Sequence, residues 1–138
     1  MINTPDSCVH LTVDIVKEIH DAVLAEFGGL RGVHDEGLLH SAVAAPQTTL
    51  GGLSPFADLA EIGAAYLFYL CRNHPFADCS KRTAMAAAIV FLRLNGIEPV
   101  ADNDKWESLM LGVSASRLDR EGTTKRFSAL LKAKRAKR

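Results

Sequence analysis

The sequence predicts an all-α protein, a compact bundle of about six helices with one short flap or hairpin loop. Apolar residues recur at helical spacing along most of the chain, and strong start and stop signals separate the apolar segments. A length of 138 residues suits a single domain spanning 1–138. Apolar residues make up 48% of the chain, which is enough to build a packed core.

Two helices with clear boundaries are predicted in the N-terminal third. Thr12 is a suitable N-cap, and the apolar positions that follow continue to Gly28, where left-handed backbone costs little. Asp35 is expected to cap a second helix, which ends before Pro46. Residues 47–56 contain two glycines and a proline without helical periodicity, so we expect a loop or short hairpin there.

Two strongly apolar helices are predicted in the middle of the chain. The first, over 58–72, is apolar nearly all round, which is typical of a buried helix. A break follows at Pro75, because proline disfavours helical backbone in the residue before it. The second helix is expected to run from near Cys79 to Asn95, where Gly96 provides a C-cap.

Two further helices are predicted in the C-terminal third. One spans 103 or 104 to about 114 and carries Trp106 on its apolar face. Thr123 or Thr124 is expected to cap the last helix, which continues through the basic end at 123–138. We interpret this basic end as a solvated helix terminus rather than a nucleic-acid contact.

Charge and cysteine content restrict the possible partners and compartments. Basic and acidic residues are balanced at 16 each, so the net charge argues neither for nor against nucleic acid, and any electrostatic recognition must come from local patches. We do not expect direct nucleic-acid binding. Three cysteines without a CxxC pair argue against a disulfide framework and for a reducing compartment. The N-terminus lacks a signal-peptide pattern, and the longest apolar stretch, 84–92, is too short to cross a bilayer. We therefore expect a soluble cytoplasmic protein without a membrane partner.

The link between the two buried helices concentrates polar side chains. They are Arg72, Asn73, His74, Asp78, Ser80, Lys81 and Arg82. Burying such groups without partners is costly, so we expect this segment to line a cleft.

These residue types suit phosphate chemistry. The first turn of the following helix has backbone N–H groups without intrahelical acceptors, and Lys81 and Arg82 would reinforce it as a phosphate site. Asp78 lies just ahead of this turn and could hold Mg²⁺ between phosphates. Histidine titrates near neutral pH, so His74 suits a base that takes a proton from a hydroxyl. Phe76 is expected to anchor the link in the core.

The segment from His74 to Ala84 resembles the HxFx(D/E)xN(G/K)R motif of the Fic/Doc family. Residues 18–20, 27–29, 32–39 and 91–96 also look like the Doc pattern, in the same order. The resemblance covers roughly residues 11–98. Lys81 at the variable position of the motif points to the Doc (death-on-curing) branch of toxin–antitoxin modules.

The resemblance implies a Fic/Doc-like fold and a nucleotide-dependent transfer, with ATP or another nucleotide and Mg²⁺ as cofactors. His74 would be the general base, and Asp78 would ligate the metal. The phosphate-binding positions would be Arg72, Ser80, Lys81 and Arg82, and the structural positions of the motif would be Phe76 and Cys79.

The same resemblance implies a reaction and partners. Met85 stands where AMP-transferring Fic proteins have a second arginine, which favours transfer of the terminal phosphate of ATP to a Thr or Ser. In the family the target is elongation factor Tu, so translation and growth would be arrested. A small antitoxin is expected, with a disordered segment that folds into a groove. Residues 47–56 would be the flap that docks the target by strand addition.

Two positions depart from the family motif. Ser80 replaces an asparagine, and Cys79 replaces a glycine or alanine. Loss of one donor to the reacting phosphate can cost about 10²–10³ in rate. Two alternatives therefore stay open: a Fic-type transferase of AMP or another phosphate ester, and a catalytically degenerate fold that acts as a binding protein.

Overall fold

The computed structural model describes residues 3–99 and 103–136. Its helices are α1 (Val13–Phe27), α2 (Glu36–Ala44), α3 (Leu59–Asn73), α4 (Ser80–Leu94), α5 (Asn103–Ser114) and α6 (Arg120–Ala136). Two short 3₁₀ turns, η1 (Pro5–Ser7) and η2 (Ala45–Gln47), precede α1 and follow α2. The predicted all-α fold of about six helices is confirmed.

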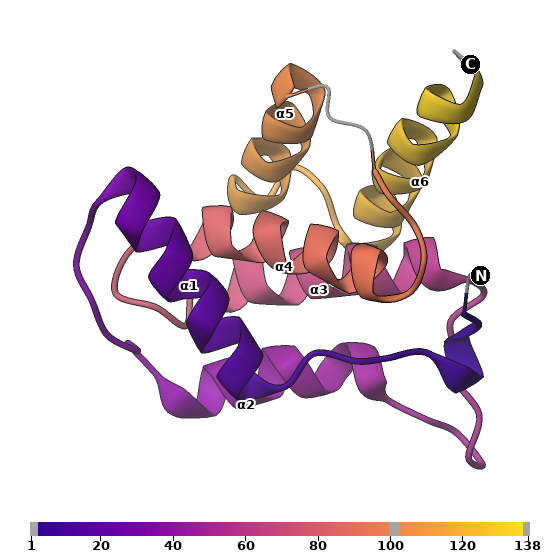
Figure 1. Cartoon of the computed structure of the whole chain (residues 1–138), viewed down its shortest axis with the longest axis horizontal. Helices are drawn as coiled ribbons and strands as arrows, with labels where there is room; N and C mark the ends of the chain where they lie inside the picture. The colour runs from indigo at the N-terminus through magenta and orange to yellow at the C-terminus, as the bar shows by residue number, and fades with distance from the viewer. Residues whose placement is uncertain (1–2, 100–102, 137–138) are drawn as a thin grey trace.

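Helix α3 lies at the centre of the bundle and contacts α2, α4, α5 and α6. Figure 1 shows α1 and α2 on one side of the α3–α4 pair, and α5 and α6 on the other. Most of α3 is buried, including the aromatic ring of Tyr66. The prediction that an all-round apolar helix lies in the core is therefore confirmed. None of the helices in the described ranges has the length and apolarity needed to span a lipid bilayer.

Small residues allow the central helices to approach closely. A Cβ built on Gly63 of α3 would lie 3.0 Å from the Phe127 ring of α6. Ala84, Ala87 and Ala88 of α4 are fully buried. Because such close packing leaves no spare volume, the α3–α4 pair forms a rigid support for the segment that joins its helices.

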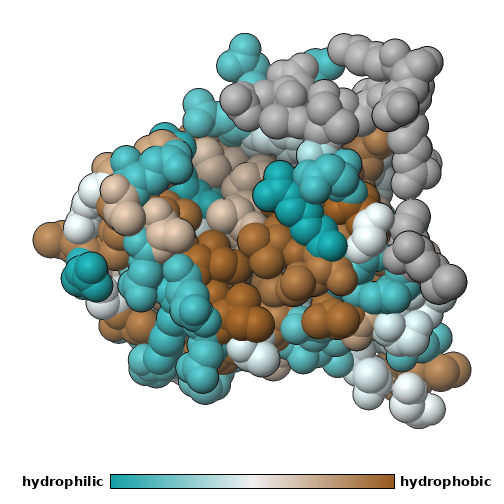
Figure 2. Space-filling view, in the orientation of Figure 1, coloured by the Kyte–Doolittle hydropathy of each residue, from teal (hydrophilic) through white to brown (hydrophobic). Residues whose placement is uncertain are grey.

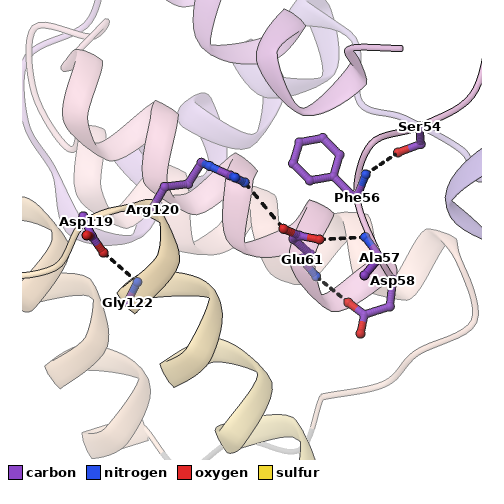
Figure 3. A network of polar contacts seen from close by, with 8 residues as sticks. All are labelled: Ser54, Phe56, Ala57, Asp58, Glu61, Asp119, Arg120 and Gly122. Atoms are coloured by element: carbon purple, nitrogen blue, oxygen red, sulfur yellow. Dashed lines mark hydrogen bonds and ion pairs between the residues drawn. The ribbon is translucent and has the colours of Figure 1, made fainter. Parts of the chain in front are cut away.

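Three helices begin where the sequence predicts, because each has a side-chain cap. The cap oxygens of Thr12, Asp35 and Asp58 accept backbone N–H bonds at the starts of α1, α2 and α3, at 3.1, 2.9 and 2.8 Å. The start of α3 is also tied to α6. Glu61 accepts the N–H of Ala57 at 2.6 Å and pairs with Arg120 at 3.7 Å, as Figure 3 shows.

The predicted cap of the last helix is wrong. Helix α6 begins at Arg120, and Asp119 Oδ1 accepts the N–H of Gly122 at 2.7 Å (Figure 3). The Thr123 hydroxyl lies inside the helix and donates to the Asp119 carbonyl oxygen at 2.7 Å. Aspartate caps a helix at least as well as threonine, so the earlier acceptor starts the helix. The side chains beyond Leu131 lie outside the described residues.

We predict that Asp119→Ala lowers the free energy of unfolding by about 1 kcal/mol, because the first turn of α6 loses its cap. Urea unfolding of the full chain measures the loss. Thr124→Ala is the matched control, since the Thr124 hydroxyl is buried without a hydrogen-bond partner among the described residues. A larger loss in Thr124→Ala than in Asp119→Ala would contradict the assignment.

The loop at 47–56 forms the predicted hairpin, but far from the polar link. Leu50 and Leu53 exchange backbone hydrogen bonds of 2.7 and 3.1 Å around two left-handed glycines. The hairpin precedes the N-terminal end of α3, whereas the polar link follows its C-terminal end (Figure 1). A helix of 15 residues separates the two by about 22 Å. Residues 47–56 therefore do not lie beside the polar link as the expected flap.

Candidate active site

The link between α3 and α4 begins and ends with a left-handed residue. His74 ends α3 with φ 47° and ψ 56°, and Cys79 precedes α4 with φ 62° and ψ 25°. An L-residue in this region costs about 1–2 kcal/mol, and such strain concentrates at functional sites. Contacts from the rest of the fold must therefore hold residues 74–79, which we call the motif loop.

The loop between α1 and α2, residues 28–35, holds the motif loop through its backbone. The bonds are Ala77 N–H to Gly32 O (3.1 Å), His34 N–H to Pro75 O (2.7 Å) and Asp35 N–H to Pro75 O (3.1 Å). An isolated antiparallel bridge joins Val33 to Phe76. The segment beside the site is therefore 28–35, and not 47–56 as the sequence analysis proposed.

Asp78 joins the two loops through its carboxylate. One oxygen accepts the N–H of Leu30 at 3.2 Å, and the other accepts the N–H of Cys79 at 2.9 Å. Gly29 makes this approach possible, since a Cβ there would lie 2.7 Å from Asp78 Oδ2. The backbone of Gly29 has φ +130°, which L-residues rarely adopt. The predicted metal ligand therefore also anchors the 28–35 loop.

Phe76 fixes the middle of the motif loop, as expected for an anchor. Its ring is 5% exposed and stacks on the imidazole of His20 in α1, with centroids 3.8 Å apart and planes 9° apart. His20 Nε2 lies 2.8 Å from the carbonyl oxygen of Asp78. The sequence does not predict this contact, although His20 interrupts the apolar face of α1 one turn after the buried Val16.

The Ser80 hydroxyl is directed into the motif loop. It accepts the N–H of Phe76 at 3.1 Å and lies 3.4 Å from the carbonyl oxygen of the same residue, to which it can donate. Ser80 is 7% exposed. This geometry commits the hydroxyl to the backbone of Phe76, so binding of phosphate by the Ser80 side chain stays a prediction.

A cavity of about 320 Å³ collects most of the predicted site. Its lining residues are His74, Phe76, Ala77, Asp78, Cys79, Ser80, Lys81, Arg82 and Ser114. Ser114, at the end of α5, was not predicted because only the tertiary fold brings it there. Arg72 does not line this cavity, and its guanidinium lies 5.4 Å from the centre of the Phe68 ring.

Positive charge surrounds the start of α4. Burial raises the pKa of the Cys71 thiol to about 11. The positive charges of Lys81 and Arg72 act on the same thiol in the opposite direction and lower its pKa. The Arg82 guanidinium lies 4.2 Å from the centre of the Phe27 ring and 3.7 Å from the Glu107 carboxylate. Together with the free N–H groups of the first turn, these cations favour an anion in the cavity.

No cluster of three or more His, Cys, Asp or Glu residues is placed to hold a metal, so far as residues 3–99 and 103–136 show. Mg²⁺ needs no such cluster, because one carboxylate, phosphates and waters complete its octahedral shell. Each Asp78 oxygen has a second lone pair beyond its hydrogen bond. The donor chemistry at Asp78 therefore fits Mg²⁺ bound together with phosphates.

A larger apolar groove adjoins this cavity. It measures about 640 Å³, and its lining residues from α1, α4 and α5 include Ile19, Val23, Phe27, Met85, Val90 and Met110. Figure 2 shows hydrophobic side chains gathered in the middle of this face of the molecule. Arg82 lines both the groove and the cavity. A partner in the groove would therefore contact the same guanidinium as a phosphate in the cavity.

We predict that Cys79→Gly raises the free energy of unfolding by about 1 kcal/mol, because glycine adopts φ 62° without steric cost. Urea unfolding measures the gain. Ala77→Gly is the matched control in the same loop, because Ala77 is not left-handed and glycine there only adds freedom to the unfolded chain. Equal effects of the two substitutions would argue against strain at Cys79.

Comparison with known proteins gives the class to which this site belongs. The sequence matches the profile of the Fic/DOC family over residues 10–92, from just before α1 to near the end of α4. The chain therefore belongs to the Fic/Doc family.

Two curated relatives are more specific. The chain is 45% identical over 95 residues to Toxin Doc of Mycolicibacterium smegmatis, which covers 67% of this chain and 73% of the relative. It is 32% identical over 109 residues to Protein kinase doc of Escherichia phage P1, which covers 79% of this chain and 85% of the relative. The resemblance inferred from the motif is thus confirmed.

Proposed function

We propose that this protein is a Doc-type toxin that transfers the terminal phosphate of ATP to a Thr or Ser hydroxyl of a protein in the translation machinery. The observation that carries the proposal is that His74, Asp78, Lys81 and Arg82 line one and the same cavity at the start of α4. The names of the relatives, Toxin Doc and Protein kinase doc, support the toxin role and phosphate transfer. By resemblance, the proposed target is elongation factor Tu.

Phosphate binding in this proposal depends on the start of α4. The N–H groups of its first turn, together with Lys81 and Arg82, would accept the phosphates and stabilise the charge that develops on the leaving diphosphate. Asp78 would hold Mg²⁺, which neutralises phosphate charge when bound. Residues 74–79 are held from both sides, so these groups would need little rearrangement when the nucleotide binds.

His74 would act on the attacking hydroxyl. Its left-handed backbone ends α3 at the rim of the cavity, and its side chain is exposed and available to a protein target. The imidazole takes the hydroxyl proton as the new O–P bond forms and the bond to the leaving ADP breaks.

Residues 28–35 would dock the target. One edge of this loop already pairs with the motif loop through Val33 and Phe76, and most of its side chains are exposed, with Leu30 at 70%. An extended target segment could add to the free edge through backbone hydrogen bonds, while its side chains provide specificity. This arrangement would bring a Thr or Ser of the target towards His74.

The apolar groove between α1, α4 and α5 would receive the antitoxin. A helix with an apolar face suits a groove of this volume and composition, and it would fold on binding. Arg82 and Glu107 at the edge provide charges that orient such a segment. Because Arg82 also lines the cavity, an antitoxin in the groove would change the phosphate site directly.

Labelling tests the proposal. Purified protein, Mg²⁺ and elongation factor Tu are incubated with ATP labelled at either the γ- or the α-phosphate. We expect label from γ-³²P only, its loss in EDTA, and arrested growth of cells that express the protein. Label from α-³²P would instead favour transfer of AMP. If neither nucleotide labels a cell extract and expression does not slow growth, a binding role replaces the proposed reaction.

A further inference from the structure

His20 is a buried polar residue that the proposed mechanism does not use. It is 4% exposed on the inner face of α1, between the buried residues Val16 and Leu24. Its ring stack on Phe76 and its hydrogen bond to the carbonyl oxygen of Asp78 both reach the motif loop. A buried histidine with both contacts on one loop can determine the conformation of that loop.

The hydrogen bond of His20 acts on one peptide group. A carbonyl oxygen can only accept, so Nε2 carries the proton and donates to Asp78 O over 2.8 Å. The N–H of the same peptide group belongs to Cys79 and donates to Asp78 Oδ1 over 2.9 Å. Two hydrogen bonds thus hold the peptide group between Asp78 and Cys79. His20 binds its carbonyl oxygen, and the Asp78 carboxylate binds its N–H.

The orientation of this plane sets the backbone of Cys79. The angle φ describes rotation about the bond between the nitrogen and Cα of Cys79, and it is +62° here. For a residue with a side chain, rotation of the preceding peptide would relieve the strain of that angle. Cys79 immediately precedes α4, so such a rotation would redirect the N–H groups ahead of Lys81 and Arg82.

We propose that His20 is a positioning residue, which holds the Asp78–Cys79 peptide so that the first turn of α4 faces the phosphate cavity. The identity of the anion as nucleotide phosphate rests on the proposed function, but the role of His20 in holding the peptide does not. The stack on Phe76 anchors the imidazole, and the bond from Nε2 transmits its position to the start of α4.

A double-mutant cycle tests this role. His20→Phe keeps an aromatic ring against Phe76 but removes the donor to Asp78 O. Cys79→Gly removes the backbone strain at residue 79, because glycine adopts a positive φ without steric cost. The hydrogen bond from His20 then has no strain to counteract, and the cycle measures this coupling. Binding of ADP with Mg²⁺ to the full chain is measured by calorimetry. We expect His20→Phe to weaken binding about tenfold with Cys79 present, and less than about threefold in the Cys79→Gly background.

The cycle separates positioning from a general loss of stability. His40→Phe changes an exposed histidine of α2 outside both cavities, and it should leave ADP binding unchanged. Equal weakening by His20→Phe in the two backgrounds would overturn the proposal, and so would no weakening in either. If His20→Phe only destabilised the packing around α1, it would weaken ADP binding equally in the two backgrounds, because that destabilisation does not depend on residue 79.

A second measurement decides the question if the wild type does not bind ADP, which would refute the proposed function. Amide hydrogen exchange of Thr83, whose N–H donates to the Cys79 carbonyl oxygen at 3.0 Å, should become faster in His20→Phe and return to the wild-type rate when Cys79→Gly is added. Nitrogen-15 spectra should show a proton on Nε2 of His20 in the wild type. Unchanged exchange in His20→Phe, or a proton only on Nδ1, would overturn the proposal.

Discussion

His74→Ala is expected to lower the rate of the proposed phosphate transfer by about 10³-fold, because the variant lacks the residue proposed as the general base. The imidazole belongs to the cavity that contains Lys81 and Arg82, and both cations remain in the variant. Binding of ADP with Mg²⁺ should therefore change less than about threefold. The rate with γ-³²P-ATP and the dissociation constant for ADP are measured on the same preparation.

The left-handed backbone of His74 requires a conformational control. Alanine at φ 47° is strained, whereas asparagine tolerates this region and has no comparable base. We expect His74→Asn to be as inactive as His74→Ala. His40→Ala alters an exposed histidine of α2 outside both cavities and should retain most of the rate. If His74→Asn keeps wild-type activity, the effect of alanine is conformational and His74 is not the base.

Gly29→Ala is expected to destabilise the protein by about 3 kcal/mol and to weaken the binding of ADP with Mg²⁺. The new Cβ would lie 2.7 Å from Asp78 Oδ2, and the backbone angle of +130° suits only glycine. Asp78 would have to move, and the bond from Leu30 N–H would be lost. Urea unfolding and calorimetry measure the two effects.

Gly28 distinguishes the effect of backbone strain from the effect of the steric clash with Asp78. Gly28 is also left-handed, with φ +75°, but a Cβ there would meet nothing within 4 Å. Gly28→Ala should therefore lose stability without a comparable loss of ADP binding. Shortening the opposing side chain in Gly29→Ala/Asp78→Ala should recover part of the stability lost in Gly29→Ala. If Gly28→Ala and Gly29→Ala behave alike in both assays, the contact with Asp78 has no special role.

Local signals predicted most of the helix boundaries. Thr12, Asp35 and Asp58 each act within three residues, so the sequence around them contains all the information that the cap requires. The last helix is the exception. Asp119 and Thr123 both lie near its start, and the order of two competing acceptors determines the boundary.

The candidate site was predicted in position but not in its contacts. Residues 74–82 are contiguous, so the motif and the helix start that follows it were visible in the sequence. The direction of the Ser80 hydroxyl and the exclusion of Arg72 from the cavity depend on the tertiary path of the loop. His20 is 58 residues from Asp78, and a single polar residue on an apolar face does not identify its partner.

The two left-handed residues of the motif loop have a consequence for heating. The loop stores strain between α3 and α4, which have the most extensive contact of any two helices in the described residues. Warming loosens the contacts that hold the loop before it separates the two helices, since local opening requires less free energy than global unfolding. The protein should therefore lose its proposed activity at a temperature where its helical circular dichroism is still intact, and it should regain that activity on cooling.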